Sequence, residues 1–309
     1  MGSNTVHLLV ADLDERGTSQ RRHSVHLLSL GRKVSADGQL GPELIERTVA
    51  LVGELARQAK EDGAERMGLV ATEAVRNASD GDNLRDLIRE RTALQLRILS
   101  GEVEARLSYL GATFFRVAAG QPATVVDVGG GSTEVVHGVG NQPNGGASLK
   151  LGSDRILLIT KADDPPTGRQ RADAAARISM VLESAPEPTG SGELIATGGT
   201  ASNLPVLLGM RRPFPDSGSV LRDEPPQDPW TTLGRDAVER AVRLTTDHPS
   251  SEVAKETGLS PARARLMAGG VMVLMGLLDH HLADQMVVTE RGLRDGVLLR
   301  LAAAISARG

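Results

Sequence analysis

The residues best suited to chemistry lie in a glycine-rich segment in the middle of the chain. Residues Val125–Glu134 read Val-Val-Asp-Val-Gly-Gly-Gly-Ser-Thr-Glu. Glycines permit a tight turn with positive φ and bring backbone N–H groups close to an anion. The aspartate of this segment, Asp127, can hold a magnesium ion directly or through water. The segment therefore predicts a phosphate-binding loop, formed by Gly129, Gly130, Gly131 and Ser132.

A glycine-rich hairpin without a ligand is the alternative, since tight turns between strands also require glycine. A dinucleotide-binding fingerprint is excluded. The glycines lead into a second strand-like run, Glu134–Val139, rather than into a helix, and the third spaced glycine is absent.

Two further glycine loops support an anionic ligand. Gly2-Ser3-Asn4-Thr5 precedes an apolar run, and Gly198-Gly199-Thr200 joins an apolar run to a helical pattern. A helix N-terminus after glycines is a favourable seat for phosphate, although an ordinary strand–helix turn has the same composition. Three such loops in one chain favour phosphate binding. The additional candidate ligands are Gly2, Ser3, Asn4, Thr5, Gly199 and Thr200.

Composition restricts the partners. The 309-residue chain has a net charge of −4 and only 2% aromatic residues, whereas nucleic-acid binders usually carry a basic face and stacking aromatics.

The absence of cysteine excludes disulfides and thiolate zinc sites. The start of the chain lacks the basic region of a secretory signal, and the apolar stretch near Val271–Leu278 is too short to span a bilayer. We expect a cytoplasmic protein with no nucleic-acid or membrane partner.

The elements that must position these loops alternate between strands and helices. Each half of the chain begins with neighbouring strands, which predicts an α/β fold of two similar domains, residues 1–119 and 120–309. Residues 211–229, rich in proline, aspartate and glycine, are expected to form a loop. The expected strands are Val6–Leu13, Ser24–Leu30, Met67–Thr72, Leu94–Leu99, Ala123–Val128, Glu134–Val139, Ala147–Leu151, Leu194–Thr197 and Gln285–Thr289. The expected helices include one starting at Pro42 and those over Asn83–Arg91, Glu102–Val117, Arg169–Leu182 and Thr200–Leu208.

In this order the motifs resemble the exopolyphosphatase/guanosine pentaphosphate phosphohydrolase family of the actin-like superfold. The resemblance implies two actin-like, ribonuclease H-like domains of the sugar kinase/Hsp70/actin superfold with a cleft between them. The matching motifs are Gly-Ser-Asn (2–4), Ala-Thr-x-Ala-x-Arg (71–76), Ser-Gly-Glu-x-Glu-Ala-Arg-Leu (100–107), Asp-x-Gly-Gly-Gly-Ser-x-Glu (127–134), Leu-Gly-x-x-Arg (151–155), Gly-Gly-Thr (198–200) and Gly-Leu-Arg-x-Gly (292–296).

The resemblance assigns roles to the acidic residues. It implies that Glu104 is the base that activates water, that Glu134 orients this water or a metal, and that Asp127 is linked to magnesium. Without the resemblance, Glu102 and Glu104 are equally well explained as acidic partners of a helix N-terminus. The expected metal ligands are Asp127 and Glu134, the expected cofactor is Mg²⁺, and no nucleotide cofactor is expected.

Two arginines in the motifs are candidates for binding phosphate, because guanidinium groups match phosphate oxygens. We favour Arg76, which follows an expected strand at its C-terminal end, where α/β sheets place ligands. Arg106 is expected to be structural.

The resemblance implies hydrolysis of terminal phosphates from inorganic polyphosphate or from guanosine pentaphosphate. A sugar or carboxylate kinase of the same superfold is less compatible with the Glu104 motif. A non-catalytic sensor or binding module for phosphate ligands is an alternative of another class.

The family differs from this sequence at the start, where it has an apolar strand that ends in aspartate just before the Gly-Ser-Asn loop. Met1 stands at that place here. We therefore expect strand Val6–Leu13 to have an exposed edge, which favours a homodimer, and we expect weaker magnesium binding and lower stability than in a chain extended by such a strand.

Overall fold

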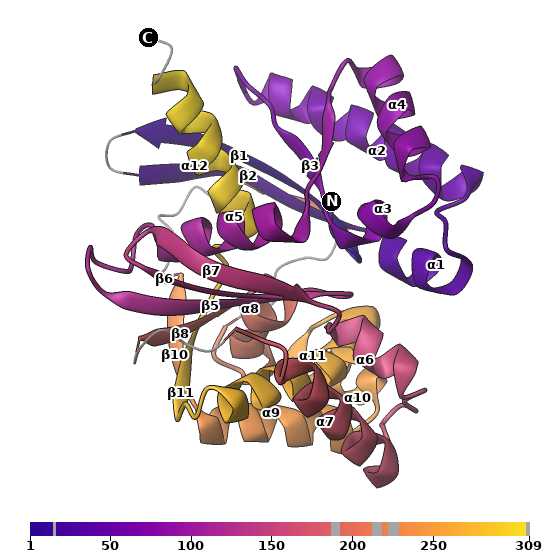
Figure 1. The fold of residues 1–309 in the computed structure, drawn as a ribbon. Coiled ribbons are helices and arrows are strands. Elements are labelled where there is room, and N and C mark those ends of the chain that lie inside the picture. The colour runs from indigo at the N-terminus through magenta and orange to yellow at the C-terminus, as the bar shows by residue number, and fades with distance from the viewer. Residues whose placement is uncertain (15–16, 187–191, 212–217, 222–228, 307–309) are drawn as a thin grey trace. The chain divides into compact units, whose positions relative to one another are not determined.

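The computed structural model describes residues 1–14, 17–186, 192–211, 218–221 and 229–306. The chain divides into two compact units (Figure 1). Unit 1 contains residues 1–100, 215–227 and 297–309, and unit 2 contains residues 101–214 and 228–296. The first change of unit therefore falls at Ser100/Gly101 and not near Gly120. The reason is helix α5 (Gly101–Thr113), which packs on the sheet of unit 2 and brings its own residues into that unit.

Unit 1 is built on a small antiparallel sheet. Strand β1 (Thr5–Asp14) pairs with β2 (Gly17–Leu27), and β2 pairs with β9 (Gly218–Leu221). The first long strand was expected, whereas the second was expected at Ser24–Leu30 and begins earlier, at Gly17. Strand β9 lies inside the segment expected to be a loop. A contact with a distant part of the chain creates this strand, and local composition does not reveal such a contact. The rest of that expected loop, residues 212–217 and 222–228, lies outside the described residues.

Helices and a second sheet complete unit 1. Strands β3 (Leu69–Ala71) and β4 (Leu96–Ile98) pair in parallel, within the two segments expected to be strands. Met1 lies beside β3, since its N–H donates to the carbonyl of Val70 at 2.7 Å and its carbonyl accepts from the N–H of Thr72 at 3.1 Å. The helices are α1 (Leu30–Asp37), α2 (Pro42–Glu61), α3 (Glu73–Asn77) and α4 (Gly81–Thr92).

Unit 2 contains a six-stranded sheet in the order β10-β11-β8-β5-β6-β7. Strands β5, β8 and β11 are parallel to one another, whereas β6, β7 and β10 run antiparallel to their neighbours. The strands are β5 (Pro122–Val128), β6 (Thr133–Val139), β7 (Gln142–Leu149), β8 (Glu193–Thr197), β10 (Trp230–Gly234) and β11 (Gln285–Thr289).

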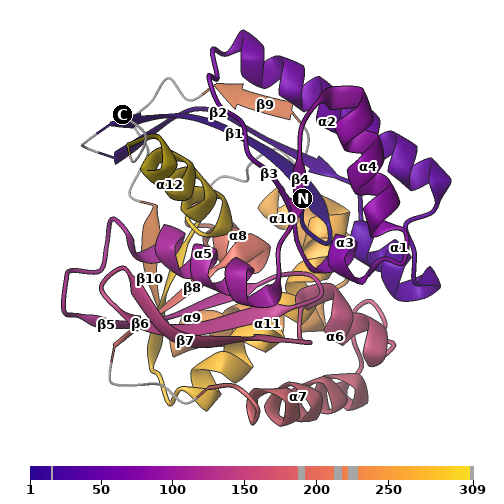
Figure 2. The same ribbon diagram turned by 45° about the horizontal axis from the view of Figure 1, so that its top comes forward.

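Helices cover both faces of this sheet (Figure 2). Helix α5 packs on one face, and α7, α9 and α11 lie on the other side. Helix α12 starts in unit 2 and ends in unit 1. The remaining helices are α6 (Ser153–Ile159), α7 (Gly168–Leu182), α8 (Gly198–Leu207), α9 (Arg235–Asp247), α10 (Ser250–Thr257), α11 (Pro261–His280) and α12 (Leu293–Ser306).

Helix α11 forms the centre of the larger core. Its length and apolar composition would allow it to cross a membrane, but 67% of its most apolar window is buried inside the protein. Val271, Val273 and Leu274 have no exposed surface. They belong to the same core as residues of α7, α8 and α9, so α11 has the surroundings of a core helix.

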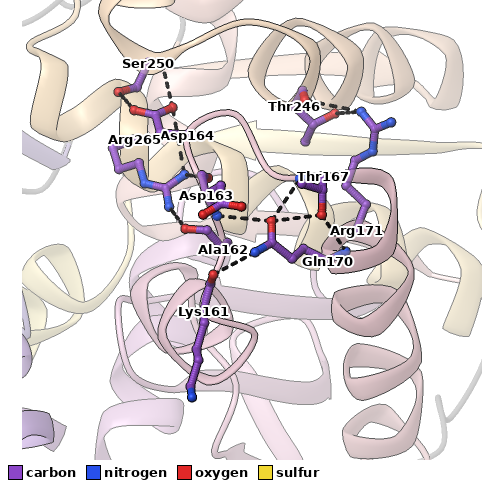
Figure 3. Close-up of polar contacts among 10 residues, drawn as sticks. All are labelled: Lys161, Ala162, Asp163, Asp164, Thr167, Gln170, Arg171, Thr246, Ser250 and Arg265. Carbon is purple, nitrogen blue, oxygen red and sulfur yellow. Dashed lines mark hydrogen bonds and ion pairs between the residues drawn. The ribbon is translucent and has the colours of Figure 1, made fainter.

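Polar contacts hold the connection between α6 and α7 against α10 and α11 (Figure 3). Gln170 and Thr167 form a capping box at the start of α7, and the Gln170 amide also donates to the carbonyl of Lys161. Asp164 accepts from the N–H of Ser250 at 2.8 Å, and Arg265 donates to the carbonyl of Asp163 at 2.7 Å. These contacts fix the end of α6, whose first residues contact the glycine loop.

Candidate active site

The register of β5 and β6 brings two of the predicted acidic residues together. Asp127 pairs directly with Glu134 across the antiparallel ladder. Side chains alternate between the faces of a sheet, and Val125 and Val136 pack against α5. Asp127 and Glu134 therefore point to the same face, the one that α5 covers. Directly paired residues have Cβ atoms about 5 Å apart, so the two carboxyl groups are close neighbours.

Helix α5 brings the third acidic residue to this face. Glu104 lies in the first turn of α5 and is 6% exposed. Ser108 follows one turn later on the same side of the helix and donates to Oδ2 of Asp127 at 2.5 Å. In contrast, Glu102 and Arg106 form an exposed ion pair, with an N–O distance of 3.1 Å. The structural role of Arg106 stays a prediction.

The position of α5 depends on a buried tyrosine. The hydroxyl of Tyr109 donates to the carbonyl of Gly140 at 3.0 Å, and burial raises the pKa of Tyr109 to about 12, so the phenol stays protonated. A Cβ atom at Gly138 would lie 2.5 Å from this hydroxyl. Gly138 therefore leaves the space that the tyrosine ring occupies.

The Gly-Leu-Arg-x-Gly motif at residues 292–296 packs closely against α5. A Cβ atom at Gly111 of α5 would lie 1.9 Å from the carbonyl oxygen of Gly292, and one at Gly296 would lie 2.0 Å from the carbonyl oxygen of Leu107. Gly111 of α5 and Gly296 of the Gly-Leu-Arg-x-Gly motif thus let the start of α12 approach α5. A Cβ atom at Gly292 would instead lie 2.5 Å from Oγ1 of Thr197, the last residue of β8. The motif supports the helix that carries Glu104.

The environment of Glu134 disfavours its charge. Burial is the main cause, and the negative charges of Glu104 and Asp127 act in the same direction, so the pKa of Glu134 lies well above its usual value. Hydrogen bonds from Ser148, at 2.7 Å, and from Ser132 oppose this shift. A nearby cation would stabilise the ionised form.

Asp127 is affected in a similar way. Burial raises its pKa, whereas the hydrogen bond from Ser108 and the positive charge of Arg294 oppose the increase. Arg294 is the arginine of the Gly-Leu-Arg-x-Gly motif, so this motif contributes positive charge to the site.

The glycine triplet forms the predicted loop but in a different backbone conformation. None of Gly129, Gly130 and Gly131 has a positive φ, so the loop does not use the positive φ that glycine permits. A Cβ atom at Gly129 would lie 3.1 Å from the carbonyl oxygen of Ser132, so this glycine allows a close approach within the loop. The carbonyl of Gly130 accepts from the N–H groups of Asp154 and Arg155, both at 3.0 Å.

The start of α6 contacts the carbonyl groups of the glycine loop and thereby holds the loop in place. A Cβ atom at Gly152 would lie 2.5 Å from the carbonyl oxygen of Gly130, and Nε of Arg155 donates to the carbonyl of Gly131 at 2.6 Å. Among the described residues, the N–H groups of Gly130 and Gly131 donate to no protein acceptor. This arrangement leaves two loop donors for an anion. The hydroxyl of Thr133 donates to Leu151 and belongs to the packing of the loop.

The glycine loop at residues 198–200 lies beside the loop at residues 129–132, because the two loops follow the paired strands β8 and β5. Gly198 has a φ of 92°, and a Cβ atom there would lie 2.6 Å from Oδ1 of Asp127. A Cβ atom at Gly199 would lie 2.9 Å from Nη1 of Arg263. The hydroxyl of Thr200 lies over Gly270 of α11, where a Cβ atom would be 2.1 Å away. This packing places Arg263 of α11 beside the loop, and the sequence had not indicated this residue.

The opening loop belongs to unit 1. The N–H of Gly2 donates to the carbonyl of Thr5 at 2.9 Å, which closes a tight turn, and the carbonyl of Asn4 accepts from the residues that follow β2. The hydroxyl of Ser3 donates to Glu73 at 3.4 Å, and Thr5 hydrogen-bonds to His7 at 2.7 Å. The structure thus shows a compact turn in which the hydroxyls of Ser3 and Thr5 are hydrogen-bonded, and phosphate binding by these residues stays a prediction.

Arg76 also belongs to unit 1, in α3. Its guanidinium donates to the carbonyl of Leu99, the residue after β4. This bond joins α3 to the end of the small parallel sheet. The role of Arg76 as a phosphate ligand stays a prediction.

The sequence pointed to most of these groups but not to all. Ser108 could have been found, because it lies four residues after Glu104 and thus on the same face of the helix. No local signal marks Arg263, since only the packing of α11 against α8 brings it to the loop.

Comparisons with known proteins agree with the motifs. The sequence model of the Ppx/GppA phosphatase family matches residues 19–304. Exopolyphosphatase 1 of Mycobacterium tuberculosis is 29% identical over 312 residues, which cover 97% of this chain and 86% of the relative. Exopolyphosphatase 2 of the same organism is 30% identical over 318 residues, which cover 97% and 96%.

Solved structures extend the likeness to the fold. The Aquifex aeolicus PPX-GPPA enzyme superimposes with a TM-score of 0.80 and 26% identity, covering 97% of both chains. An exopolyphosphatase from Cytophaga hutchinsonii has a TM-score of 0.84 at 20% identity, covering 98% of this chain and 96% of the other, and shows the shared fold alone. The predicted α/β fold class is confirmed, and the chain shares its fold with these Ppx/GppA structures. Since the family model extends over most of the sequence, this protein belongs to the Ppx/GppA phosphatase family and is a phosphoanhydride hydrolase.

Proposed function

We propose that this protein is an exopolyphosphatase, which releases terminal phosphate from inorganic polyphosphate by metal-assisted attack of water. One observation carries the proposal. Three carboxyl groups, those of Glu104, Asp127 and Glu134, gather beside a glycine loop that keeps the N–H groups of Gly130 and Gly131 available. Hydrolysis of a phosphoanhydride requires a positioned water and neutralised phosphate oxygens, and this arrangement offers groups for both.

Glu104 is the proposed general base. Its position in the first turn of α5 places a carboxyl group beside Asp127 and Glu134 but on a different element. A base must be fixed in position relative to the proton that it accepts, and α5 is held by Tyr109 and by the contact between Gly111 and Gly292. Arg263, beside the third glycine loop, is a proposed phosphate ligand because its guanidinium matches phosphate oxygens.

Asp127 and Glu134 are the proposed ligands of Mg²⁺. The described residues contain no group of three or more acidic or histidine side chains able to hold a metal. Mg²⁺ is commonly bound by one or two carboxylates, with waters and substrate phosphates completing its shell, so two carboxylates fit this ion. When bound, Mg²⁺ neutralises charge on phosphate oxygens. The raised pKa values of both residues are consistent with a site that needs a cation to hold two ionised carboxylates.

Polyphosphate is the preferred substrate in this proposal for two reasons. The relatives from Mycobacterium tuberculosis carry the name exopolyphosphatase. The chain is also poor in aromatic residues, with three Phe, one Trp and one Tyr, and Tyr109 is fully buried. A guanine base usually gains affinity by stacking on aromatic rings, whereas polyphosphate offers only anionic oxygens.

A substrate panel tests the proposal. Purified protein is given long polyphosphate, short polyphosphate or guanosine pentaphosphate, each with and without Mg²⁺, and released orthophosphate is measured over time without ATP. We expect release from polyphosphate that requires Mg²⁺. Preferential turnover of guanosine pentaphosphate would overturn the substrate assignment. Binding of polyphosphate without any phosphate release would instead support a phosphate-ligand sensor.

A further inference from the structure

The hydroxyl of Ser108 is fully buried and points away from its own helix. It donates to Oδ2 of Asp127 at 2.5 Å, so the bond joins α5 to the end of β5. A buried serine in a helix has a simpler partner available, the backbone carbonyl one turn earlier. Thr113, on the same helix, uses that partner and donates to the carbonyl of Tyr109 at 2.9 Å. Ser108 therefore differs from an ordinary buried hydroxyl of α5.

The carboxyl group of Asp127 is confined on its other side as well. The backbone of Gly198 lies against Oδ1, since a Cβ atom there would be only 2.6 Å away. One oxygen is thus hydrogen-bonded to α5, and the other is packed against the start of α8. Rotation of the carboxyl group would break the first contact or create a clash at the second.

The same serine lies one turn after Glu104. Because residues four apart share a helix face, the helix segment that presents the proposed base also fixes Asp127. The relative position of the two carboxyl groups is then set by one rigid turn of α5.

We propose that Ser108 is a positioning residue for the hydrolysis reaction, which holds the Asp127 carboxyl group in register with Glu104. The inference rests on the proposed function. Ser108 acts through Asp127 and does not contact the substrate. Loss of its donor lets the carboxyl group rotate, and a ligand or water held by Asp127 then moves relative to the base.

Three substitutions separate the hydrogen bond from packing. Ser108→Ala removes the donor, Ser108→Cys keeps a side chain of similar size with a weak donor, and Ser108→Thr keeps the hydroxyl. Thr113→Val is the matched control, because it removes a buried hydroxyl from the same helix outside the site.

Steady-state kinetics on polyphosphate with Mg²⁺ provide the first measurement. We expect Ser108→Ala and Ser108→Cys to lower kcat by about 10- to 100-fold, in line with the loss of a hydrogen bond to a charged group. KM should change little, since Ser108 does not contact the substrate. Ser108→Thr should retain most of kcat, and Thr113→Val should alter only the melting temperature.

Crystal structures of the wild type and of Ser108→Ala provide a measurement independent of activity. We expect the Asp127 side chain to leave its wild-type rotamer in the variant. An unchanged rotamer, a wild-type kcat for Ser108→Ala, or a Cys variant that is more active than the Thr variant would each overturn the proposal. If the wild-type protein releases no phosphate from any substrate, the proposed function fails, and the crystal structures still decide whether Ser108 orients Asp127.

Discussion

Gly198 lies so close to Asp127 that a Cβ atom on the glycine would be 2.6 Å from Oδ1 of the aspartate and 2.6 Å from the carbonyl oxygen of Val128. Gly198 also has a φ of 92°, which side chains other than glycine rarely adopt. Two independent constraints therefore require glycine at this position. One concerns backbone conformation, and the other concerns space beside the site.

A pair of alanine variants can separate these two constraints. Gly209 has a φ of 72°, and a Cβ atom there would meet nothing within 4 Å, so Gly209→Ala reports the backbone cost alone. We expect it to lower the free energy of unfolding by about 1–2 kcal/mol without loss of activity. Gly198→Ala should cost at least as much stability and should also displace Asp127 and reduce activity at least tenfold, about 1.4 kcal/mol in the barrier. Equal activity of the two variants would contradict a spatial role for Gly198.

The proposed base is tested by a conservative change in the first turn of α5. Glu104→Gln removes the carboxylate that accepts a proton but keeps the shape of the side chain. We expect a loss of about 10²–10⁴-fold in kcat, as is typical for loss of a general base, with an unchanged circular dichroism spectrum. Glu102→Gln is the matched control, because the side chain of Glu102 is 74% exposed and pairs with Arg106 at the surface. If both variants keep wild-type activity, another group activates the water.

The sequence predicted which residues lie close together better than it predicted the structural reasons for their types. Asp127, Glu134 and the glycine triplet were expected to form one loop, and the register of β5 and β6 follows from that hairpin. The conformation of the loop was not predicted, because positive φ occurs at Gly198 and not in the triplet. A glycine in the sequence indicates a position where a side chain is not tolerated. The sequence does not show whether the reason is a positive φ or the close approach of a neighbouring segment.

Contacts between distant segments account for the other differences. The need for glycine at position 296 depends on Leu107, almost two hundred residues earlier in the chain, and the need for glycine at position 292 depends on Thr197. Helix α6 (Ser153–Ile159) was missed because it is only two turns long and is fixed by the glycine loop. Short elements of this kind are stabilised by tertiary contacts, which hydrophobic periodicity does not report.

The raised pKa of Glu134 predicts a cost in stability. A carboxyl group whose folded pKa lies above its unfolded value, about 4.3, binds more protons in the folded state. Its stabilising contribution is fully present below the unfolded pKa and is lost as the pH rises through the folded pKa. Glu134→Gln removes this loss. Without added divalent metal, the variant should therefore be more stable than the wild type at neutral pH, while activity is lost.

Thermal unfolding between pH 4 and pH 8 measures this effect. The difference in melting temperature between Glu134→Gln and the wild type should increase with pH, because only the wild type must keep a proton or accept a buried charge. Added Mg²⁺ should reduce the difference if Glu134 is one of its ligands. A difference that is independent of pH would show that Glu134 is not protonated more strongly in the folded protein.

A cluster of three histidines predicts the opposite pH dependence. The rings of His280 and His281 are 5.0 Å apart, and those of His137 and His281 are 5.9 Å apart. Burial, with His280 and His137 as further causes, lowers the pKa of His281 to about 4. Because the unfolded value is about 6.5, the folded state binds fewer protons in this range. The contribution of His281 to stability is present above pH 6.5 and is lost as the pH falls towards 4.

Replacement of the histidine tests this prediction. A shift of this size corresponds to at most about 3 kcal/mol of stability lost on acidification, and solvent screening reduces this value because the ring is only partly buried. His281→Asn cannot be protonated, so its free energy of unfolding should fall less steeply than that of the wild type between pH 6.5 and pH 4. His248→Asn is the control, since the side chain of His248 is 53% exposed and interacts only with Glu252 among the ion pairs of the described residues. Parallel stability curves for the wild type and His281→Asn would mean that the histidine cluster already accepts a proton in the folded protein, and the acid sensitivity would then arise elsewhere.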